Sequence, residues 1–250
     1  MVDSDHNWRM WGERDPYYAV LADPRFRNGH IDAHREAFFA SGEIFVTHWL
    51  ATFERHFGPS QRARALDFGC GVGRLTIPLA GHFDQVVGLD IAPAMLAEAR
   101  RNGGPGNIDY VLSDDALSRL AGTFDFVNSC IVLQHIPVRR GMALLARLLD
   151  HVRPGGGCLI QLSTRRNYSW WRNLRYHIRH NMPGGQALMN RLAGKAADTP
   201  VMQMNEYPLD DVLRLFSRAG FDDLLLRYED HGGIDTTTIM ARRTDRAAAP

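Results

Sequence analysis

The sequence predicts an α/β fold: a doubly wound, mostly parallel seven-stranded sheet that ends in an antiparallel hairpin. Between residues 65 and 163, five short apolar runs alternate with amphipathic helical patterns. A last helix is followed by two further strand-like runs, with the turn residues "HGGI" between them. The chain has 250 residues, 45% hydrophobic and 23% charged, which suits one soluble domain with a large core.

The first 60 residues are expected to form a helical cover. Apolar and aromatic side chains recur at spacings of three and four from Ile31 to about Phe57, which indicates a long amphipathic helix. Gly58 and Pro59 end that pattern. Upstream, "WGERDPYYAVL" (11–21) is dense in aromatic residues. Its tyrosines are expected either to cover a ligand or to pack the first helix on the sheet.

Residues 61–163 are expected to form a ligand-binding core. The apolar runs are "ALDF" (65–68), "QVVGLD" (85–90), "IDYVL" (108–112), "FDFVNSC" (124–130) and "GCLIQLS" (157–163). The helical patterns between them are 74–81, 93–101 and 138–152. Strands rich in Val, Ile, Leu and Phe that alternate with helices are typical of a parallel sheet covered on both faces.

The rhythm of strands and helices breaks after residue 163. Residues 164–206 carry no clean repeat and are expected to be an insertion that recognises substrate. A helix (209–219) and two strands (222–228 and 235–241) then close the fold within residues 207–243. All four parts are expected to belong to a single domain, 1–250.

Charge and cysteine content exclude several classes of protein. The formal net charge of +1 argues against a stable nucleic-acid partner, and no apolar run is long enough to span a membrane. Cys70, Cys130 and Cys158 are widely separated and odd in number, which disfavours structural zinc and a disulfide framework. The first 16 residues lack the apolar stretch of a secretory signal, so a cytoplasmic location is expected.

The stretch "LDFGCGVGRLTIPLA" (66–80) places Gly69, Gly71 and Gly73 between a buried strand and a helix. Glycine permits positive φ and close approach of a ligand, and the start of a helix favours an anionic group. Asp90 closes the next strand. If the two strands are neighbours, its carboxylate lies beside the glycine loop, where it can accept both hydroxyls of a ribose.

Two kinds of nucleotide-like ligand suit such a loop. A dinucleotide site favours G-x-G-x-x-G, whereas this chain has G-x-G-x-G and places Arg74 where the last glycine would be. Residues 64–80 and 85–96 instead resemble the S-adenosylmethionine site of class I, Rossmann-like methyltransferases. The resemblance implies that the loop holds the methionine end of that cofactor and that Asp90 holds its ribose.

The resemblance extends downstream to cover about residues 60–163, together with the closing helix and hairpin. "VLSDD" (111–115) looks like the segment that contacts adenine, with Asp114 as the better match and Asp115 beside it. "FDFVNSCIVLQHI" (124–136) resembles the strand that passes under the cofactor, and "VRPGGGCLIQL" (152–162) the turn into the fifth strand. The candidate cofactor-binding residues are Tyr18, Asp67, Gly69, Gly71, Arg74, Asp90, Ile91, Met95, Asp114, Asp115 and Cys130.

Simpler structural roles compete with several of these assignments. Asp67 can stabilise the loop without touching a ligand. Asp114 can also be a residue that simply forms a turn, because Ser and Asp favour turns. Ile91 and Met95 can sandwich an adenine or be ordinary core residues.

His135, in "LQHIP", is the candidate general base, because ligands of open α/β sheets bind where strands end. The alternative is a core histidine that caps the next helix. The expected reaction is methylation of a hydroxyl oxygen on a small molecule, sugar or glycan, because such an acceptor must lose a proton. No metal ligand set is identified.

The insertion carries a local positive charge. Residues 165–195 contain seven Arg or Lys and no Asp or Glu, interleaved with aromatic residues. This favours an anionic acceptor, or one presented near anionic lipid; the alternative is a solvated basic helix with its aromatic face on the core. Rival functions are methylation of RNA or DNA, N- or C-methylation, a non-catalytic cofactor-binding regulator and a nicotinamide dehydrogenase. A homo-oligomer is left open.

Overall fold

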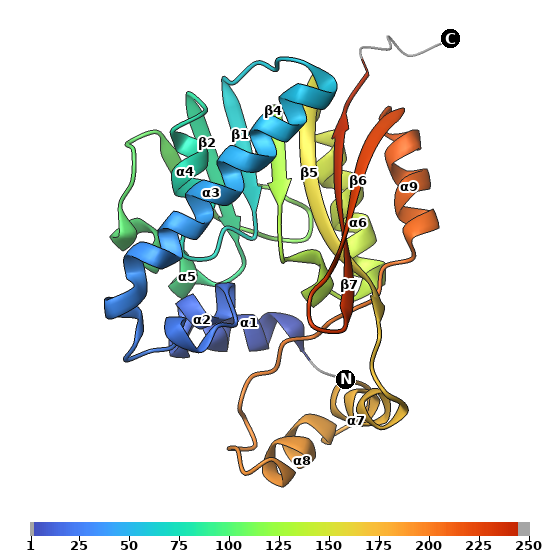
Figure 1. Cartoon of the computed structure of the whole chain (residues 1–250). Coiled ribbons are helices and arrows are strands. Elements are labelled where there is room, and N and C mark those ends of the chain that lie inside the picture. Colours follow the sequence, from blue (N-terminus) through green and yellow to red (C-terminus); the bar gives the residue numbers. More distant parts are fainter. Residues whose placement is uncertain (1–2, 245–250) are drawn as a thin grey trace.

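The computed structural model describes residues 3–244 and contains one seven-stranded sheet with the order β3-β2-β1-β4-β5-β7-β6 (Figure 1). The strands are β1 (Arg64–Phe68), β2 (Gln85–Asp90), β3 (Ile108–Leu112), β4 (Phe124–Ser129), β5 (Val152–Arg166), β6 (Asp223–Asp230) and β7 (Ile234–Arg242). The first five strands pair in parallel, and β7 pairs antiparallel with both β5 and β6. The predicted fold class is therefore confirmed, including the closing hairpin.

Helices cover both faces of the sheet (Figure 1). They are α1 (Ser4–Arg14), α2 (Pro16–Val20), α3 (Ile31–Phe57), α4 (Thr76–Ala80), α5 (Pro93–Asn102), α6 (Val138–Asp150), α7 (Trp170–Asn181), α8 (Gly185–Leu192) and α9 (Leu209–Arg218), with 3-10 turns η1 (Pro24–Phe26) and η2 (Leu133–His135). The α3 helix crosses one face, and α6 and α9 lie on the other. The topology places every parallel strand's carboxyl end at one edge of the sheet.

The α3 helix buries one stripe of side chains against the sheet. Its Phe53 is fully buried and packs edge-on against Phe126 of β4, with ring centroids 5.4 Å apart. Phe53 also lies over Gly157 of β5. A Cβ at residue 157 would lie 2.2 Å from the Phe53 ring, so this close helix–sheet contact requires glycine.

The opposite face of the sheet is covered by α6 and α9, whose leucines and phenylalanines form the largest apolar cluster. Tyr207, just before α9, is buried among them. Its hydroxyl lies 2.8 Å from the carbonyl oxygen of Leu133 and 2.9 Å from that of Ile136. Tyr207 thereby ties the start of α9 to the η2 turn, which precedes α6 and contains His135.

The insertion lies at the carboxyl edge of the sheet, below the strands in Figure 1. It comprises α7, α8 and an extended return segment that leads to Tyr207. Trp170 and Trp171 are 65% and 67% exposed, so the alternative of a basic helix with its aromatic face on the core does not hold for these two tryptophans. Tyr176 does pack inward, with its hydroxyl 3.0 Å from the carbonyl oxygen of Met204.

Candidate active site

A pocket of about 970 Å³, counted with its open mouth, lies at the carboxyl edge of the sheet under α1 and α2. Eleven of the twelve predicted site residues line it, which places the glycine loop, the acid of β2 and the predicted base around one space. They are Asp67, Gly69, Gly71, Arg74, Asp90, Ile91, Met95, Asp114, Asp115, Cys130 and His135.

The glycine loop turns tightly because its glycines adopt positive φ values. Gly69 has φ +74°, and a Cβ there would lie 2.3 Å from a Val132 methyl. Gly71 has φ +52°, and a Cβ there would lie 2.6 Å from Val20 of α2. Side chains at either position would be strained and would collide with the pocket wall. The loop therefore presents bare backbone to the pocket.

Asp90 joins the end of β2 to the glycine loop. One carboxylate oxygen accepts the backbone N–H of Gly71 at 2.9 Å, and the other accepts that of Ala92 at 2.8 Å. Burial raises the pKa of Asp90 to about 6, although these two hydrogen bonds act in the opposite direction. Each oxygen keeps a further lone pair, so the carboxylate can still accept a hydrogen bond from a ligand hydroxyl.

Asp67 has both oxygens engaged inside the protein. It accepts hydrogen bonds from Thr76 Oγ1 at 2.6 Å and from Asn128 Nδ2 at 2.7 Å, and burial raises its pKa. These contacts tie β1 to α4 and β4. Asp67 lines the pocket, but its hydrogen bonds are those of a residue that stabilises the loop.

Arg74 is the buried cation of the pocket, only 5% exposed. Its Nη1 lies 3.4 Å from Ser41 Oγ of α3, and its Nε has no hydrogen-bond partner among the described residues. The main chain here is fixed by close packing, because a Cβ at Gly42 would lie 2.1 Å from the Arg74 carbonyl oxygen. A buried guanidinium with an unused donor suits a ligand carboxylate, such as that of a methionine moiety.

Asp114 shapes a turn at the pocket mouth. Its carboxylate accepts hydrogen bonds from the backbone N–H of Ser118, at 3.0 Å, and from the Ser118 hydroxyl. These bonds lower the pKa of Asp114. Ile91 and Met95 also line the pocket, and Met95 is almost fully buried.

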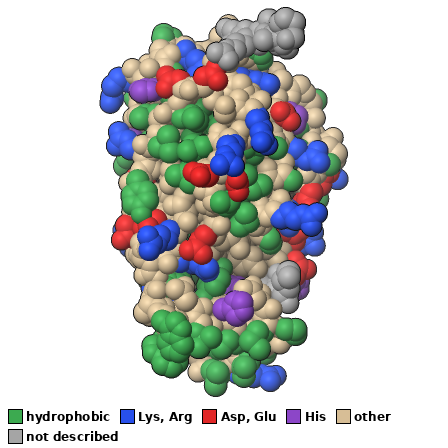
Figure 2. Space-filling model, turned by 90° about the vertical axis from the view of Figure 1, so that its right-hand side faces the viewer, with side chains coloured by type: hydrophobic (Ala, Val, Ile, Leu, Met, Phe, Trp, Pro, Cys, Tyr) green, Lys and Arg blue, Asp and Glu red, His purple; other side chains and the backbone are tan. Residues whose placement is uncertain are grey.

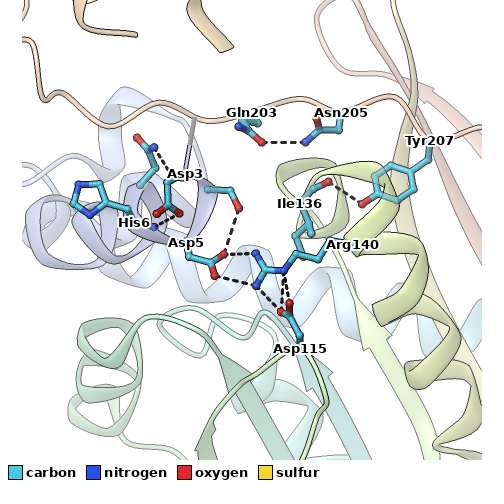
Figure 3. Close-up of polar contacts among 11 residues, drawn as sticks. Asp3, Asp5, His6, Asp115, Ile136, Arg140, Gln203, Asn205 and Tyr207 are labelled. Atoms are coloured by element: carbon cyan, nitrogen blue, oxygen red, sulfur yellow. Dashed lines mark hydrogen bonds and ion pairs between the residues drawn. The ribbon is translucent and has the colours of Figure 1, made fainter. Parts of the chain in front are cut away.

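Arg140 links the pocket to the α1 helix that covers it. This residue was not predicted to belong to the site. Figure 3 shows its guanidinium between the carboxylates of Asp5 in α1 and Asp115 after β3. The Nη2 atom lies 2.9 Å from Asp5 Oδ2, and Nε lies 2.8 Å from Asp115 Oδ1. One feature of the sequence could have pointed to Arg140. Arg139 and Arg140 occupy the first turn of α6, where the helix dipole disfavours cations.

The α1 helix contributes Ser4, Asp5 and Trp8 to the pocket lining, and none of the three was predicted. Asp5 contacts Arg140 and Trp8 contacts His135, each more than a hundred residues away, so no local sequence pattern indicates these residues. Tyr18 does not line the pocket. The Arg27 guanidinium lies over its ring at 4.0 Å, and the neighbouring Ala19 and Val20 face the pocket instead.

His135 is buried against the ring of Trp8, with centroids 4.7 Å apart. Its Nδ1 lies 2.6 Å from the carbonyl oxygen of Gln203, in the return segment of the insertion. A carbonyl can only accept, so Nδ1 carries the hydrogen and Nε2 carries the lone pair. Burial lowers the pKa of His135 to about 4, which keeps the ring neutral at physiological pH.

Cys130 lies at the end of β4 with its Sγ 3.4 Å from Gln161 Oε1, and burial raises its pKa to about 12. It is therefore a neutral thiol. No group of three or more His, Cys, Asp or Glu side chains in residues 3–244 is arranged to hold a metal ion. No helix in this described part is long and apolar enough to cross a membrane.

Comparison with known sequences identifies this part of the chain. Residues 65–156 match the family model described as a methyltransferase domain. Over 109 residues the chain is 39% identical to the trans-aconitate 2-methyltransferase of Deinococcus radiodurans, covering 43% of this chain and 40% of that protein. Over 126 residues it is 33% identical to a ubiquinone biosynthesis O-methyltransferase of Erwinia tasmaniensis, covering 49% and 50%. The matches thus span about half or less of these relatives.

Solved structures share the fold over most of the chain. The magnesium protoporphyrin IX methyltransferase of Synechocystis, solved with bound S-adenosylhomocysteine, has a TM-score of 0.62 at 18% identity and covers 97% of this chain and 100% of its own. The N-methyltransferase NodS of Bradyrhizobium japonicum has a TM-score of 0.58 at 14% identity, covering 97% and 99%. Residues 65–156 therefore match a methyltransferase domain in sequence, and the chain as a whole has the fold of class I, Rossmann-like methyltransferases.

Proposed function

We propose that this protein transfers the methyl group of S-adenosylmethionine to a hydroxyl oxygen of a small molecule, sugar or glycan in the cytoplasm. The observation that carries the proposal is the shared pocket. Asp90 and the glycine loop form one part of its wall, and His135, held in one tautomer by Gln203, forms another.

The cofactor fits the donors and acceptors that the pocket offers. Asp90 would accept the ribose hydroxyls, and the backbone around Gly69 and Gly71 would approach the methionine end. Arg74 would pair with the methionine carboxylate through the donor that has no partner in the structure. Ile91 and Met95 would flank the adenine ring.

The reaction needs positioning and one proton transfer. The acceptor oxygen would attack the sulfonium methyl in line, so that the O–C bond forms as the C–S bond breaks and a neutral thioether leaves. The hydroxyl proton would pass to Nε2 of His135. With a pKa of about 4, His135 is a weak base, which favours an acidic hydroxyl, such as a phenol, over a simple alcohol.

A carboxylate acceptor is the second candidate, because two arginines line the pocket. Because Arg74 would hold the methionine carboxylate, Arg140, which binds the carboxylates of Asp5 and Asp115, is the cation that an acceptor carboxylate would approach. A carboxylate has no proton to lose, so its methylation would not need His135. The relative from Deinococcus radiodurans, named a trans-aconitate 2-methyltransferase, is consistent with this candidate.

Calorimetry with S-adenosylmethionine and S-adenosylhomocysteine tests the cofactor, and methyl transfer from labelled cofactor to phenols, sugars and carboxylates tests the acceptor. We expect saturable binding of both ligands and transfer to one acceptor class. An absence of binding heat and of any thermal shift with either nucleoside would overturn the proposal. Cofactor binding without transfer to any acceptor would instead favour a non-catalytic, cofactor-binding regulator.

A further inference from the structure

An exposed apolar surface lies on α7, α8 and the turn between them. Nine large hydrophobic side chains are exposed among the described residues, and six of them fall between residues 170 and 192. We call these six the α7–α8 apolar face: Trp170, Trp171, Leu174, Met182, Leu188 and Leu192. Figure 2 shows hydrophobic side chains gathered at the lower end of the molecule, where Figure 1 places these helices.

Nothing in the described chain covers this face. The α7 helix buries only His180, and among the other elements it packs chiefly on α8. Leu192 is 73% exposed. A cluster of large apolar side chains of this kind is a mark of an interaction surface rather than of an ordinary monomer exterior.

The α7–α8 segment itself carries charge of one sign, although acids of other segments lie near it: Glu206 pairs with Arg166, and Asp198 pairs with Arg14. Seven Arg or Lys and no Asp or Glu occur in residues 165–195, although the whole chain is close to neutral. Arg172, Arg175 and Arg179 belong to α7 itself, one turn or less apart. The pKa of Arg179 is lowered mainly by its burial and also by the positive charge of the nearby Arg175. The partner must therefore combine negative charge with an apolar interior.

We propose that the α7–α8 apolar face binds the surface of an anionic phospholipid bilayer. Tryptophan is suited to the boundary between headgroups and acyl chains, and aliphatic side chains beside it can enter the acyl region. Arginines at the same level pair with lipid phosphates. An amphipathic, basic, tryptophan-bearing helix that lies in the interface has this composition.

Two other occupants suit the surface less well. A second copy of the chain, docked face to face, would bring two groups of arginines together, and the nearby acids Glu206 and Asp198 already pair with Arg166 and Arg14. Single-stranded nucleic acid would use the tryptophans and arginines. It would leave Leu188, Leu192 and Met182 exposed, since aliphatic side chains offer no stacking surface.

A docked membrane would lie beside the cover of the pocket. Asn7 of α1 accepts hydrogen bonds through Oδ1 from Gln186 Nε2 of α8, at 3.2 Å, and from the backbone N–H of Val201, at 2.8 Å. The same α1 helix lines the pocket. Contact with lipid at α7 and α8 is therefore one helix away from the site where an acceptor would enter.

Flotation of the full chain with extruded vesicles tests the proposal. One set is phosphatidylcholine alone and the other is an equal mixture of phosphatidylcholine and phosphatidylglycerol, each at low and high salt. We expect binding to the anionic vesicles that falls at high salt. The W170S/W171S double variant should lower the bound fraction at least about tenfold. The R172Q/R175Q double variant should weaken binding to the anionic vesicles more than binding to vesicles of phosphatidylcholine alone.

Ile44→Ser is the matched control, because Ile44 is 70% exposed on α3, outside this face. It should bind vesicles like the unchanged protein, and circular dichroism should show all variants folded. Failure of the unchanged protein to bind anionic vesicles would overturn the proposal, as would equal binding by W170S/W171S. A dimer abolished by W170S/W171S, or an oligonucleotide bound in place of vesicles, would each assign the face to another partner and overturn it too.

Discussion

Asp90 accepts the backbone N–H of Gly71 at 2.9 Å, so the acid that closes β2 holds the middle glycine of the loop after β1. The two groups that would grip the sugar and the amino-acid ends of the cofactor are thus joined before any ligand arrives. Such pre-organisation lowers the cost of binding, because the loop has little freedom left to lose.

Replacing Asp90 with Ala should weaken cofactor binding by at least about tenfold, since it removes the ribose acceptor and releases the loop. Calorimetry with S-adenosylhomocysteine measures this directly. Asp84→Ala is the control, because Asp84 is an exposed acid just before β2 and lies outside the pocket. Equal affinities in the two variants would remove the ribose assignment.

Cofactor affinity should fall as the pH drops below about 6. Burial raises the pKa of Asp90 to about 6, so acid converts the carboxylate to a neutral form that accepts ribose hydroxyls less well. Because binding favours the charged form, affinity should decline toward about tenfold per pH unit on the acid side. The Asp90→Asn variant should show a flat profile over the same range. A profile in the unchanged protein that matches this variant contradicts the assignment.

Replacing His135 with Ala should lower kcat by about a hundredfold or more for a hydroxyl acceptor, while the cofactor dissociation constant stays within a factor of two or three. Because the pKa of His135 is about 4, its protonation should not reduce kcat above pH 5. Single-turnover rates and calorimetry separate the two effects. Normal turnover in the variant, with a carboxylate as the preferred acceptor, would favour the second candidate function.

Gly42→Ala should destabilise the fold by about 2 kcal/mol or more, because the new Cβ would lie 2.1 Å from the Arg74 carbonyl oxygen. Urea unfolding gives the change in free energy. Gly106→Ala is the control, since nothing lies within 4 Å of a Cβ there and its φ is not positive. Similar midpoints for the two variants would show that α3 shifts away from the loop without cost.

Arg140→Met should loosen α1 without unfolding the sheet. The change leaves the carboxylates of Asp5 and Asp115 without their shared cation, at a cost on the order of 1 kcal/mol for partly exposed pairs. Hydrogen exchange of residues 4–14 should quicken. Arg139→Met tests the same loss of charge one residue earlier, on an exposed side chain. Equal exchange in both variants would argue against the bridge.

The parts of the fold with strong periodicity could be predicted from the sequence. The bounds of β2, β3 and α3 agree with the apolar runs and with the long amphipathic pattern. The β5 strand extends from Val152 to Arg166, well beyond the predicted 157–163, because β4 pairs with Val152 and β7 pairs along β5 as far as Arg166. Pairing with a partner strand adds residues that no local pattern marks.

Parts of the candidate site could also be predicted from local sequence, and other parts could not. The glycine loop and Asp90 could be found because strand, turn and acid follow one another closely in the chain. The bridge between the helical cover and the pocket could not, because Asp5 and Arg140 are 135 residues apart and only the fold brings them together. The bounds of α7 and α8 were not predicted, because residues 164–206 carry no clean repeat, and a basic helix there was only one of two alternatives.

The direction of the last strand has a practical consequence for fusion proteins. The β7 strand runs antiparallel to β5, so Arg242 pairs with Gly157 at the edge of the sheet away from the pocket. Ser4, at the start of α1, is itself part of the pocket lining. An affinity handle or fluorescent reporter placed after β7 would therefore stay clear of ligand entry, whereas one placed ahead of α1 would crowd it.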